Sequence, residues 1–373
     1  MKARRLLLLG GGHAHLQVLQ AFARQRLRGT ELTLVTPQAE QIYSGMVPGL
    51  VAGHYDSASC VIPLGPLAAA AGARFIGASA IRLDTANRRV SLADGRSLDY
   101  DLLSLDTGAA MDRGRLPGAR EHALFVRPMA DFLSLLPQFL DRAAARPLKV
   151  VVLGAGAAGV ELALALQFRL AAAGGAPGSQ VALLTGGPEP LASHPPAVQR
   201  RVLQALAARG IAVHRQACIA LEARAAVLAS GARLACDVPL VATGAEAPAW
   251  LRGSGLALDA QGYVQTGPTL QSRSHPEVFA VGDVATLDGA PHPRSGVYAV
   301  RAGPPLALNL RRRLAGGVLQ PHRPQARALN LIACGEQRAI ASWGGWSAEG
   351  RWVWRWKDRI DRAFIARYTP ASG

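Results

Sequence analysis

The sequence has few cysteines, and no two of them lie close together. Cys60, Cys218, Cys236 and Cys334 are the only four among 373 residues, and none belongs to a C-x-x-C pair. This spacing argues against a structural zinc site and a local redox disulfide, and it fits a cytoplasmic, reducing compartment. The histidines also lack metal-ligand spacing, so we expect no metal site. A disulfide between Cys60 and Cys334 stays open, because separation along the chain does not fix separation in space.

Long apolar runs are absent as well. No stretch approaches the roughly 18 to 20 apolar residues that cross a bilayer. The nearest imitation of a signal peptide, Lys2 to Leu9, runs directly into a glycine-rich loop. We therefore interpret it as the first strand of a fold.

Acidic residues are scarce relative to basic ones. The chain has 41 Lys and Arg against 25 Asp and Glu, and this net charge of +16 predicts contact with anions such as nucleotides, acidic lipid head groups or nucleic acid. No helix-turn-helix, zinc-finger or RNA-binding aromatic signature occurs, so nucleic acid is the least favoured partner. The length and a hydrophobic fraction of 50% predict a folded protein of about two to three domains.

Two glycine-rich loops carry most of the information in the sequence. The first, Gly10-Gly11-Gly12-His13-Ala14-His15, follows the apolar run Leu6 to Leu9, and the second, Gly154-Ala155-Gly156-Ala157-Ala158-Gly159, follows Val150 to Leu153. In each, backbone N–H groups at the start of a helix can receive a pyrophosphate, so two loops predict two nucleotides. The second loop matches G-x-G-x-x-G throughout, whereas the first has His15 in place of the third glycine. His13 and His15 are either ligands of the first nucleotide or packing residues.

The segments that follow the two loops share one plan. Each continues as helix, strand, hairpin region and an apolar strand that ends in Thr-Gly, at Thr107-Gly108 and at Thr243-Gly244. This order predicts an internal duplication and an α/β fold with two Rossmann-like units. The expected strands and helices of the first unit are 5–9, 14–28, 31–35, 80–84, 88–92 and 100–105, and those of the second are 149–153, 158–172, 180–184, 196–208, 211–215 and 238–242.

The usual acidic ribose ligand at the end of the second strand is missing from both units. In the first unit its place falls at Thr36-Pro37, so the ribose contact must come from a hydroxyl, from backbone or from Glu40. In the second unit the strand ends in Thr185-Gly186-Gly187, with neither an acid nor a clear arginine. A later apolar strand delivers Asp283 after Gly282 at its carboxyl end, where ligand contacts gather in parallel sheets.

The ordered set of glycine loop, Thr-Gly, glycine loop, Thr-Gly and Gly-Asp resembles the pyridine nucleotide-disulfide oxidoreductase superfamily over residues 4 to 314. The resemblance implies that the first loop binds FAD and the second binds NAD(P)H. It also implies an FAD domain split around the NAD(P) domain. The expected domains are 1–115 and 251–327 for FAD, 116–250 for NAD(P), and a C-terminal hairpin and helix in 328–373.

The missing cysteine pair narrows the resemblance. Disulfide reductases need such a pair, and sulfide:quinone reductases need a cysteine in the stretch that is 109–153 here, which has none. Type II NADH dehydrogenases, quinone reductases and ferredoxin-reductase-like enzymes remain, and Gly159-Val160-Glu161 resembles their G-x-E extension. More narrowly, the first loop, Tyr43 to Gly49, Ser295 to Arg301 and Trp356 to Asp361 resemble flavoprotein domains fused to selenide, water dikinase. That resemblance implies an association with selenium metabolism rather than an activity.

Three residues are the candidates for catalysis. Glu161 is expected near the nicotinamide and flavin, although a carboxylate in the first turn also complements the helix dipole without a catalytic role. Pro48, in the irregular segment Ile42 to Gly49, is expected in an apolar cover over the flavin or in a surface turn. Tyr298 marks a helix start aimed at the flavin, which would stabilise negative charge there. The expected cofactor-binding residues are Gly10, Gly12, His13, Ala14, His15, Thr36, Pro37, Ala80, Thr107, Gly108, Gly154, Gly156, Gly159, Glu161, Thr243, Gly244, Gly282, Asp283, Val297 and Tyr298.

The C-terminal tail bears on the electron acceptor. Aromatic or apolar residues recur every fourth position and predict one apolar stripe with basic flanks; they are Trp352, Trp356, Ile360, Phe364 and Tyr368. Such a helix either lies in a membrane interface or docks on its own FAD domain or on a dimer partner.

We therefore expect an FAD-dependent NAD(P)H oxidoreductase that passes a hydride to the flavin and electrons onward, with a quinone as the acceptor. The enzyme would be cytoplasmic or peripheral on the cytoplasmic face of the membrane. Two alternatives stay open. One is a soluble flavin reductase for selenium metabolism or for a protein electron carrier, and the other is a non-catalytic nucleotide-sensing flavoprotein.

Overall fold

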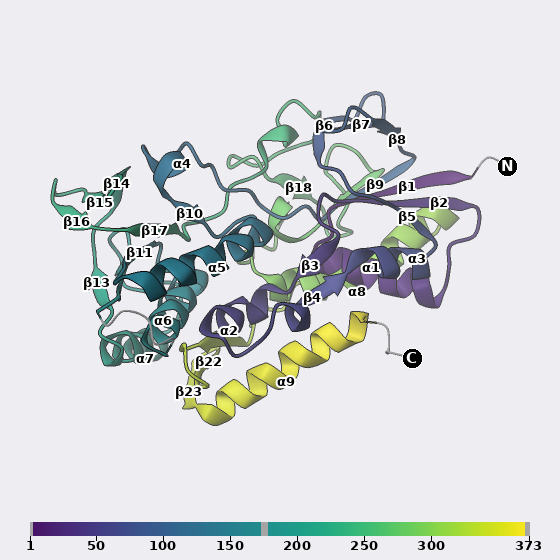
Figure 1. Cartoon of the computed structure of the whole chain (residues 1–373). Helices are drawn as coiled ribbons and strands as arrows, with labels where there is room; N and C mark the ends of the chain where they lie inside the picture. The colour runs from purple at the N-terminus through teal and green to yellow at the C-terminus, as the bar shows by residue number, and fades with distance from the viewer. Residues whose placement is uncertain (1–2, 173–177, 370–373) are drawn as a thin grey trace.

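The computed structural model describes residues 3–172 and 178–369, and its centre is a five-stranded parallel sheet with the order β19-β9-β1-β2-β5 (Figure 1). Strand β1 is a run of leucines and is buried from Leu6 onward, as expected for a central parallel strand covered on both faces. Helices α1, α3 and α8 pack around this sheet. The elements are β1 (Arg4–Leu9), α1 (His13–Arg24), β2 (Thr30–Val35), α3 (Leu64–Ala70), β5 (Ala73–Ile76), β9 (Leu102–Leu105), β19 (Val278–Ala280) and α8 (Gly296–Ala315).

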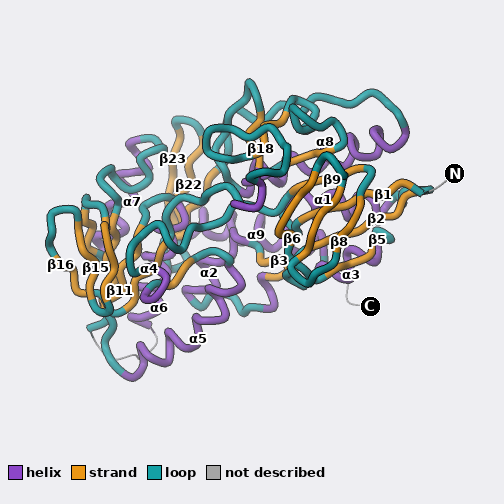
Figure 2. Tube along the Cα trace, turned by 90° about the horizontal axis from the view of Figure 1, so that it is seen from above, coloured by secondary structure: helices purple, strands orange, loops and turns teal. Residues whose placement is uncertain are grey.

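A second five-stranded parallel sheet has the order β10-β17-β11-β12-β13. Its helix α6 is buried along most of its length, because β11 lies on one side and α2 on the other. The elements are α4 (Ala119–His122), β10 (Leu124–Phe125), α5 (Met129–Ala145), β11 (Lys149–Leu153), α6 (Ala157–Ala172), β12 (Gln180–Leu184), α7 (Pro196–Ala208), β13 (Ala212–His214) and β17 (Val238–Val241). Figure 2 shows the two sheets side by side, with β1, β2 and β9 on one side and β11 on the other.

The two sheets repeat one topology. In each, the strand before the glycine loop is central, the next strand along the chain lies on one side, and the strand ending in Thr-Gly lies on the other. A three-stranded antiparallel sheet precedes the Thr-Gly strand in both. These sheets are β6 (Ala80–Asp84), β7 (Arg89–Leu92) and β8 (Ser97–Asp99), and β14 (Cys218–Glu222), β15 (Ala225–Leu228) and β16 (Arg233–Ala235). The predicted α/β fold with two Rossmann-like units is confirmed.

The fifth strands of the two sheets have different origins. Strand β19 pairs with β9 although it follows the whole second sheet in sequence, whereas β10 precedes β11. The first sheet is therefore assembled from two separate stretches of chain. The remaining short elements are β3 (Glu40–Ile42), η1 (Ser44–Met46), α2 (Val47–Ala52), η2 (Ala58–Cys60), β4 (Val61–Pro63), η3 (Ala249–Leu251), β18 (Val264–Thr266), η4 (Gly282–Val284) and β20 (Ala285–Leu287).

The C-terminal region is a three-stranded antiparallel sheet followed by a long helix. The sheet comprises β21 (Asn330–Ala333), β22 (Ala339–Trp343) and β23 (Trp346–Gly350), and α9 spans Arg351–Tyr368. Helix α9 runs along one side of the molecule, from the C-terminal sheet toward the first sheet (Figure 1). None of the helices in the described ranges is long and apolar enough to cross a membrane.

The predicted single apolar stripe on this helix is wrong. Trp352 is 52% exposed, whereas Phe364 is 7% exposed and packs in the core of the first sheet. A four-residue repeat advances 400° per step against the 360° of a full turn, so the stripe drifts around the helix and passes from the outer to the inner face. The buried face follows the 3.6-residue period instead; it comprises Val353, Lys357, Asp361, Phe364 and Tyr368.

The segment from Ile42 to Gly49 also contains more structure than its glycines and proline indicate. It includes η1 and the start of α2, with Pro48 in the first turn of the helix, where a missing N–H costs nothing. Helix α2 packs against α6, so this segment links the two units of the fold.

The second glycine loop provides a matched test of the fold. A Cβ at Gly159 would lie 1.8 Å from the carbonyl oxygen of Gly154, whereas a Cβ at Gly156 would meet nothing within 4 Å. We expect Gly159→Ala to lower the free energy of unfolding by about 1–3 kcal/mol through overpacking, and Gly156→Ala to leave it unchanged. Thermal unfolding of both variants beside the parent checks this. Equal melting temperatures would contradict the close helix–strand packing.

Candidate cofactor and active site

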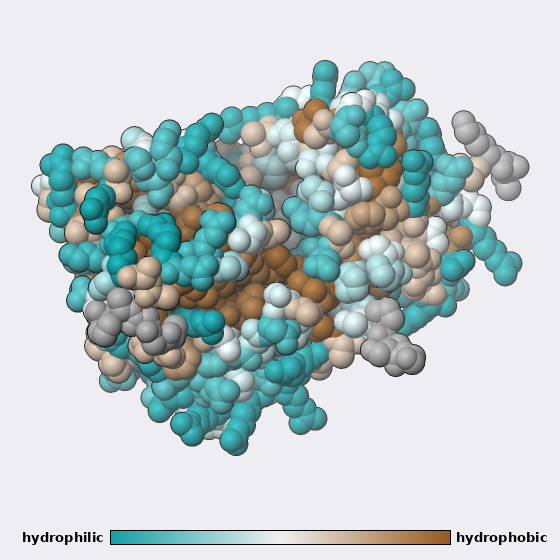
Figure 3. All heavy atoms as spheres, in the orientation of Figure 1, coloured by the Kyte–Doolittle hydropathy of each residue, from teal (hydrophilic) through white to brown (hydrophobic). Residues whose placement is uncertain are grey.

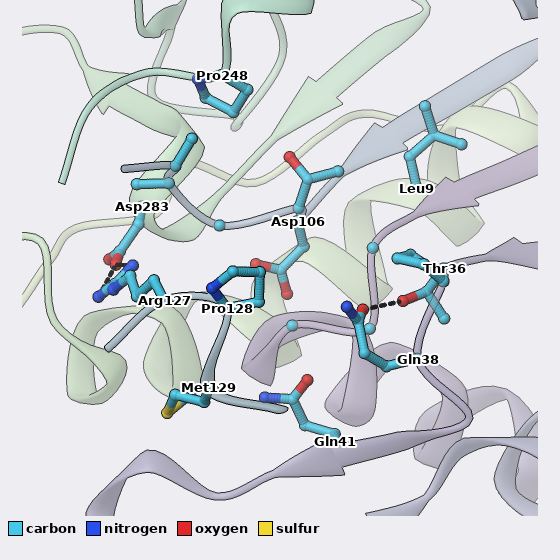
Figure 4. Close-up of a pocket in the computed structure, with 18 of the residues that line it drawn as sticks. Leu9, Thr36, Gln38, Gln41, Asp106, Arg127, Pro128, Met129, Pro248 and Asp283 are labelled. Carbon is cyan, nitrogen blue, oxygen red and sulfur yellow. Dashed lines mark hydrogen bonds and ion pairs between the residues drawn. The ribbon is translucent and has the colours of Figure 1, made fainter. Parts of the chain in front are cut away.

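A cavity of about 590 Å³ opens at the carboxyl ends of β1, β2 and β9, where the first site is expected. Figure 4 shows part of its wall, with labelled residues from distant parts of the chain that include Leu9, Thr36, Asp106, Arg127, Pro248 and Asp283. Of the predicted cofactor residues, those that line it are Gly10, Gly12, His13, Thr36, Pro37, Ala80, Thr107, Gly108 and Asp283. The parallel strands thus bring most of the predicted first site into one place.

The first glycine loop leaves no room for side chains. Gly10 has a φ of +92°, and a Cβ there would lie 2.3 Å from the backbone oxygen of Asp106. A Cβ at Gly12 would lie 2.4 Å from the carboxyl group of Asp106. The loop is therefore pressed against the end of β9, which its glycines permit.

The side chain of Asp106 caps the N-terminus of helix α1. Its Oδ2 accepts hydrogen bonds from the backbone N–H groups of Ala14 at 2.8 Å and His15 at 2.9 Å. The side chain is buried and lines the cavity. Burial raises the pKa of Asp106 to about 7, although the two amide hydrogen bonds oppose this shift. The predicted ligand Ala14 thus gives its N–H to the protein itself.

Two polar atoms in the cavity wall have no partner. His13 Nε2 and Thr107 Oγ1 are buried and make no hydrogen bond within the part of the chain that the structure describes. Burial lowers the pKa of His13 to about 4, so its ring is neutral at physiological pH. Buried polar groups in native proteins are normally paired, so these two atoms indicate that a polar ligand completes the site. A dinucleotide with hydroxyl and phosphate groups fits these donors.

Arg127 brings a positive charge to the cavity. Its two terminal nitrogens each donate to Asp283 Oδ2 at 3.2 Å, and both residues line the wall (Figure 4). The Arg127 side chain is 40% exposed, which leaves it free to contact a ligand as well. The cavity therefore presents both a cation for phosphates and a carboxylate for hydroxyl groups.

The region expected at the ribose contains polar side chains but no buried acid. The Thr36 hydroxyl donates to Gln38 Oε1 at 3.2 Å, and Glu40 lies exposed on β3 at the rim. These groups match the hydroxyl and the later glutamate that the sequence left open.

His15 lies outside the cavity. Its ring nitrogens contact the carbonyl oxygen of Gly10 at 2.6 Å and Ser104 Oγ at 2.8 Å, and its side chain is fully buried. The histidine bridges β1 and β9 where a third glycine would allow close packing, so it serves the fold.

Helix α8 begins at the cavity, but the two residues expected there do not line its wall. Ser295, Gly296 and Ala299 line the wall, whereas Val297 and Tyr298 do not. The Tyr298 ring stacks on His292 with centroids 4.6 Å apart. Gly282 supports the site from behind, because a Cβ there would lie 2.8 Å from Asp106 Oδ1.

The second glycine loop lies open at the surface. Gly154 has a φ of +109° and packs against the end of β17, while Gly156, Thr243 and Gly244 are exposed. This arrangement leaves backbone N–H groups at the start of α6 accessible to a dinucleotide.

Glu161 and Pro48 lie between α6 and the elements that cover it. Glu161 Oε1 accepts a hydrogen bond from the backbone N–H of Ala333 in β21 at 2.8 Å. Burial raises the pKa of Glu161 to about 7, and the positive charge of Lys357 opposes the shift. Pro48 is buried in α2, whose neighbours Val47 and Val51 belong to the core around α6. Neither residue lines the 590 Å³ cavity.

The four cysteines are free thiols. Burial raises the pKa of Cys60 to about 11 and that of Cys334 to about 12, which keeps both thiols protonated and unreactive. No cluster of metal-ligating residues occurs within residues 3–172 and 178–369.

Two residues that line the cavity were not among the site residues predicted from the sequence. Asp106 had a signal, because it ends a buried parallel strand immediately before Thr-Gly. Arg127 had none, because it lies in the short turn between β10 and α5, 156 positions from its partner Asp283.

Comparison with known proteins agrees with this geometry. Residues 4–303 match the family of pyridine nucleotide-disulphide oxidoreductases. The demethylphylloquinone reductase NdbB of Synechocystis sp. is 26% identical over 354 residues, which cover 91% of this chain and 86% of that protein. The NADH dehydrogenase-like protein Rv1812c of Mycobacterium tuberculosis is 31% identical over 239 residues, or 62% of this chain and 60% of that protein.

Solved structures share the fold. The sulfide:quinone oxidoreductase of Aquifex aeolicus has a TM-score of 0.83 at 19% identity, covering 98% of this chain and 91% of that one. NDH2 of Plasmodium falciparum in complex with NADH has a TM-score of 0.80 at 13% identity, covering 99% and 98%. The chain therefore belongs to the pyridine nucleotide-disulphide oxidoreductase family and is an FAD-dependent NAD(P)H oxidoreductase.

Proposed function

We propose that this oxidoreductase passes electrons from NAD(P)H through FAD to a quinone at a membrane surface. The observation that carries the proposal is the position of α9. One face of this helix contacts the wall of the cofactor cavity, and the opposite face exposes tryptophan and arginine side chains.

The inner face of α9 reaches the segment beside the cavity. The Lys357 ammonium donates to the carbonyl oxygen of Gly45 and, at 2.6 Å, to Asp361 Oδ2. Phe364 stacks on Tyr43 with ring centroids 4.4 Å apart and lies 5.8 Å from the ring of His13, which lines the cavity. A displacement of α9 would therefore also move the residues that it contacts beside the cofactor cavity.

The outer face of α9 and the neighbouring β22–β23 turn suit a membrane interface. Tryptophan and arginine favour the boundary between water and lipid, and the net charge of +16 favours anionic head groups. The exposed apolar residues of this surface, here called the tryptophan surface, are Trp343, Trp346, Trp352, Trp356 and Ile360, and the exposed basic residues beside them are Arg351, Arg355 and Arg359.

A quinone is the acceptor class that this position favours, because it is an apolar electron carrier dissolved in the bilayer. Apolar side chains also gather across the middle of the face in Figure 3, over the junction between the two sheets and above α9. The similar NdbB protein is named a demethylphylloquinone reductase, so its own acceptor is a quinone.

Bound FAD would supply the redox chemistry, by accepting a hydride from NAD(P)H and releasing two electrons to the acceptor. We assign the other tasks to this chain. The amides of Gly11 and Gly12 and the side chain of His13 would hold the cofactor, with Arg127 balancing the charge of its phosphates. The start of α8 at Gly296 would stabilise negative charge in the cavity through the helix dipole.

For the second site we propose that the loop Gly154 to Gly159, with Thr243 and Gly244, binds NAD(P)H. In this proposal Glu161 has a positioning role, because its hydrogen bond holds β21 against α6. Pro48 likewise helps α2 to pack against α6. The resemblance to selenide, water dikinase fusion partners stays a prediction, and so do a homodimer and a soluble reductase role.

The Arg127 assignment predicts a specific defect. Replacing Arg127 with alanine leaves the Asp283 carboxylate unpaired in the cavity, next to the expected phosphates. We expect the FAD dissociation constant to rise at least about tenfold, the cost of losing one charge-assisted contact. Titration by flavin fluorescence measures it. Arg113→Ala, which removes an exposed pair with Asp131, is the control and should bind FAD normally.

The catalytic proposal predicts a two-step reaction. In anaerobic stopped flow, NADH or NADPH should bleach the flavin absorbance, and a short-chain quinone should restore it faster than an oxidised selenium compound or an oxidised ferredoxin does. Comparison of the two nicotinamides gives the donor. A protein that holds FAD but is bleached by neither nicotinamide would instead be a nucleotide sensor.

The membrane proposal predicts loss of lipid binding when the tryptophan surface is altered. We expect Trp352→Ser combined with Trp356→Ser to weaken co-sedimentation with anionic phospholipid vesicles at least about tenfold, because each exposed indole contributes roughly 1 kcal/mol or more at an interface. Ile219→Ser, at an exposed apolar residue of β14, is the control. Equal binding of all three proteins would contradict the proposal.

A further inference from the structure

We propose that Asp106 couples FAD binding to proton uptake, so that the affinity for FAD falls as pH rises. The inference rests on FAD binding in the cavity described above and concerns a residue that the protein adds to that site. It starts from an observation about anions at the beginning of α1.

The start of α1 already holds an anionic group. Oδ2 of Asp106 accepts hydrogen bonds from the second and third backbone amides of the helix, those of Ala14 and His15. Those are the amides that a nucleotide phosphate would otherwise approach at a helix N-terminus. The phosphates of FAD would then bind the backbone amides earlier in the glycine loop. In that position they would lie beside the Asp106 carboxylate.

The Asp106 carboxyl group cannot move away from the incoming phosphates. The glycine loop encloses it on one side and η4 on the other, because a Cβ at Gly12 would lie 2.4 Å from it and a Cβ at Gly282 would lie 2.8 Å from it. The side chain is only 3% exposed, so water screens its charge poorly. The Asp106 carboxylate can therefore relieve its repulsion from a bound dianion by taking up a proton.

Among the described residues, no cation pairs with the Asp106 carboxyl group to offset that repulsion. From η4, Asp283 adds a second negative charge, and Arg127, which lies between β10 and α5, donates to Asp283 and not to Asp106. From α1, His13 and His15 are neutral, because burial lowers the pKa of each to about 4. From β9, Ser104 carries no charge. Burial by the protein itself already raises the pKa of Asp106 to about 7, so protonation near neutral pH costs little.

The sign of the effect follows from this arrangement. Bound phosphates raise the pKa of Asp106 further, so a proton from solvent adds to its carboxylate as FAD binds. Well below pH 7 the acid is neutral before and after binding, and the affinity is highest. As pH rises above 7 the affinity falls, by about tenfold for each unit by which FAD raises the pKa.

The test is FAD release from the purified flavoprotein. After dilution, free FAD fluorescence gives the dissociation constant between pH 6 and pH 8.5. We expect it to rise at least about tenfold over this range in the parent. Asp106→Asn keeps an acceptor oxygen for the two amides but cannot ionise, so its dissociation constant should change less than about twofold and lie below that of the parent at pH 8.5.

A control and a second measurement keep the test decisive. Glu277→Gln alters another buried carboxyl group, which is ion-paired with Arg88 before the amino end of β19, away from the cavity at the carboxyl ends of the strands, and should keep the parental pH profile. Calorimetric titration of apoprotein with FAD at pH 7.5, in buffers of different ionisation enthalpy, should show net proton uptake in the parent even if Asp106→Asn fails to fold. No proton uptake, or parallel pH profiles for the parent and Asp106→Asn, would overturn the inference. A protein that binds no FAD at any pH would contradict its premise instead.

Discussion

The contact between the Asp106 carboxyl group and the first turn of α1 is the constraint on which the first nucleotide site depends. It joins the ends of two neighbouring strands, β1 and β9, to one helix start, and it fixes how closely the glycine loop can lie. Gly12 is required because a Cβ there would meet the Asp106 carboxyl group, and Gly10 because a Cβ there would meet the Asp106 backbone. His15 reinforces it from the core side by bridging Gly10 and Ser104. The loop that we propose to bind the FAD phosphates is held in shape by the protein's own acid.

Helix α9 joins this site to the surface. Its buried face carries a lysine and an aspartate, which are costly to bury unless they are paired, and Lys357 and Asp361 pair with each other. Burial raises the pKa of Asp361, and the neighbouring ammonium opposes this. The same helix exposes its tryptophans on the other side. One element therefore connects the cavity wall with the surface that we assign to the membrane.

Local patterns in the sequence were sufficient for the central architecture. The leucines before Gly10 and the valines before Gly154 predict buried parallel strands, and both glycine loops lie where those strands end. The residues that shape the site are different, because their partners are distant in sequence. The amide partners of Asp106 are 91 and 92 positions away, and only the pairing of β1 with β9 brings them together. The faces of α9 were misjudged because a four-residue repeat is not the helical period.

The late arrival of β19 has a consequence for the order of folding during synthesis. The second sheet is complete once β17 has been made at Val241, whereas the first sheet still lacks its edge strand, which begins at Val278. On the ribosome, the unit that is second in sequence can therefore close before the first. Until then the unpaired edge of β9 is exposed, and Asp283 is absent from the cavity. A nascent chain would complete the sheet of the proposed NAD(P)H site before that of the proposed FAD site, so on this proposal flavin is the cofactor that a truncated translation product would lack.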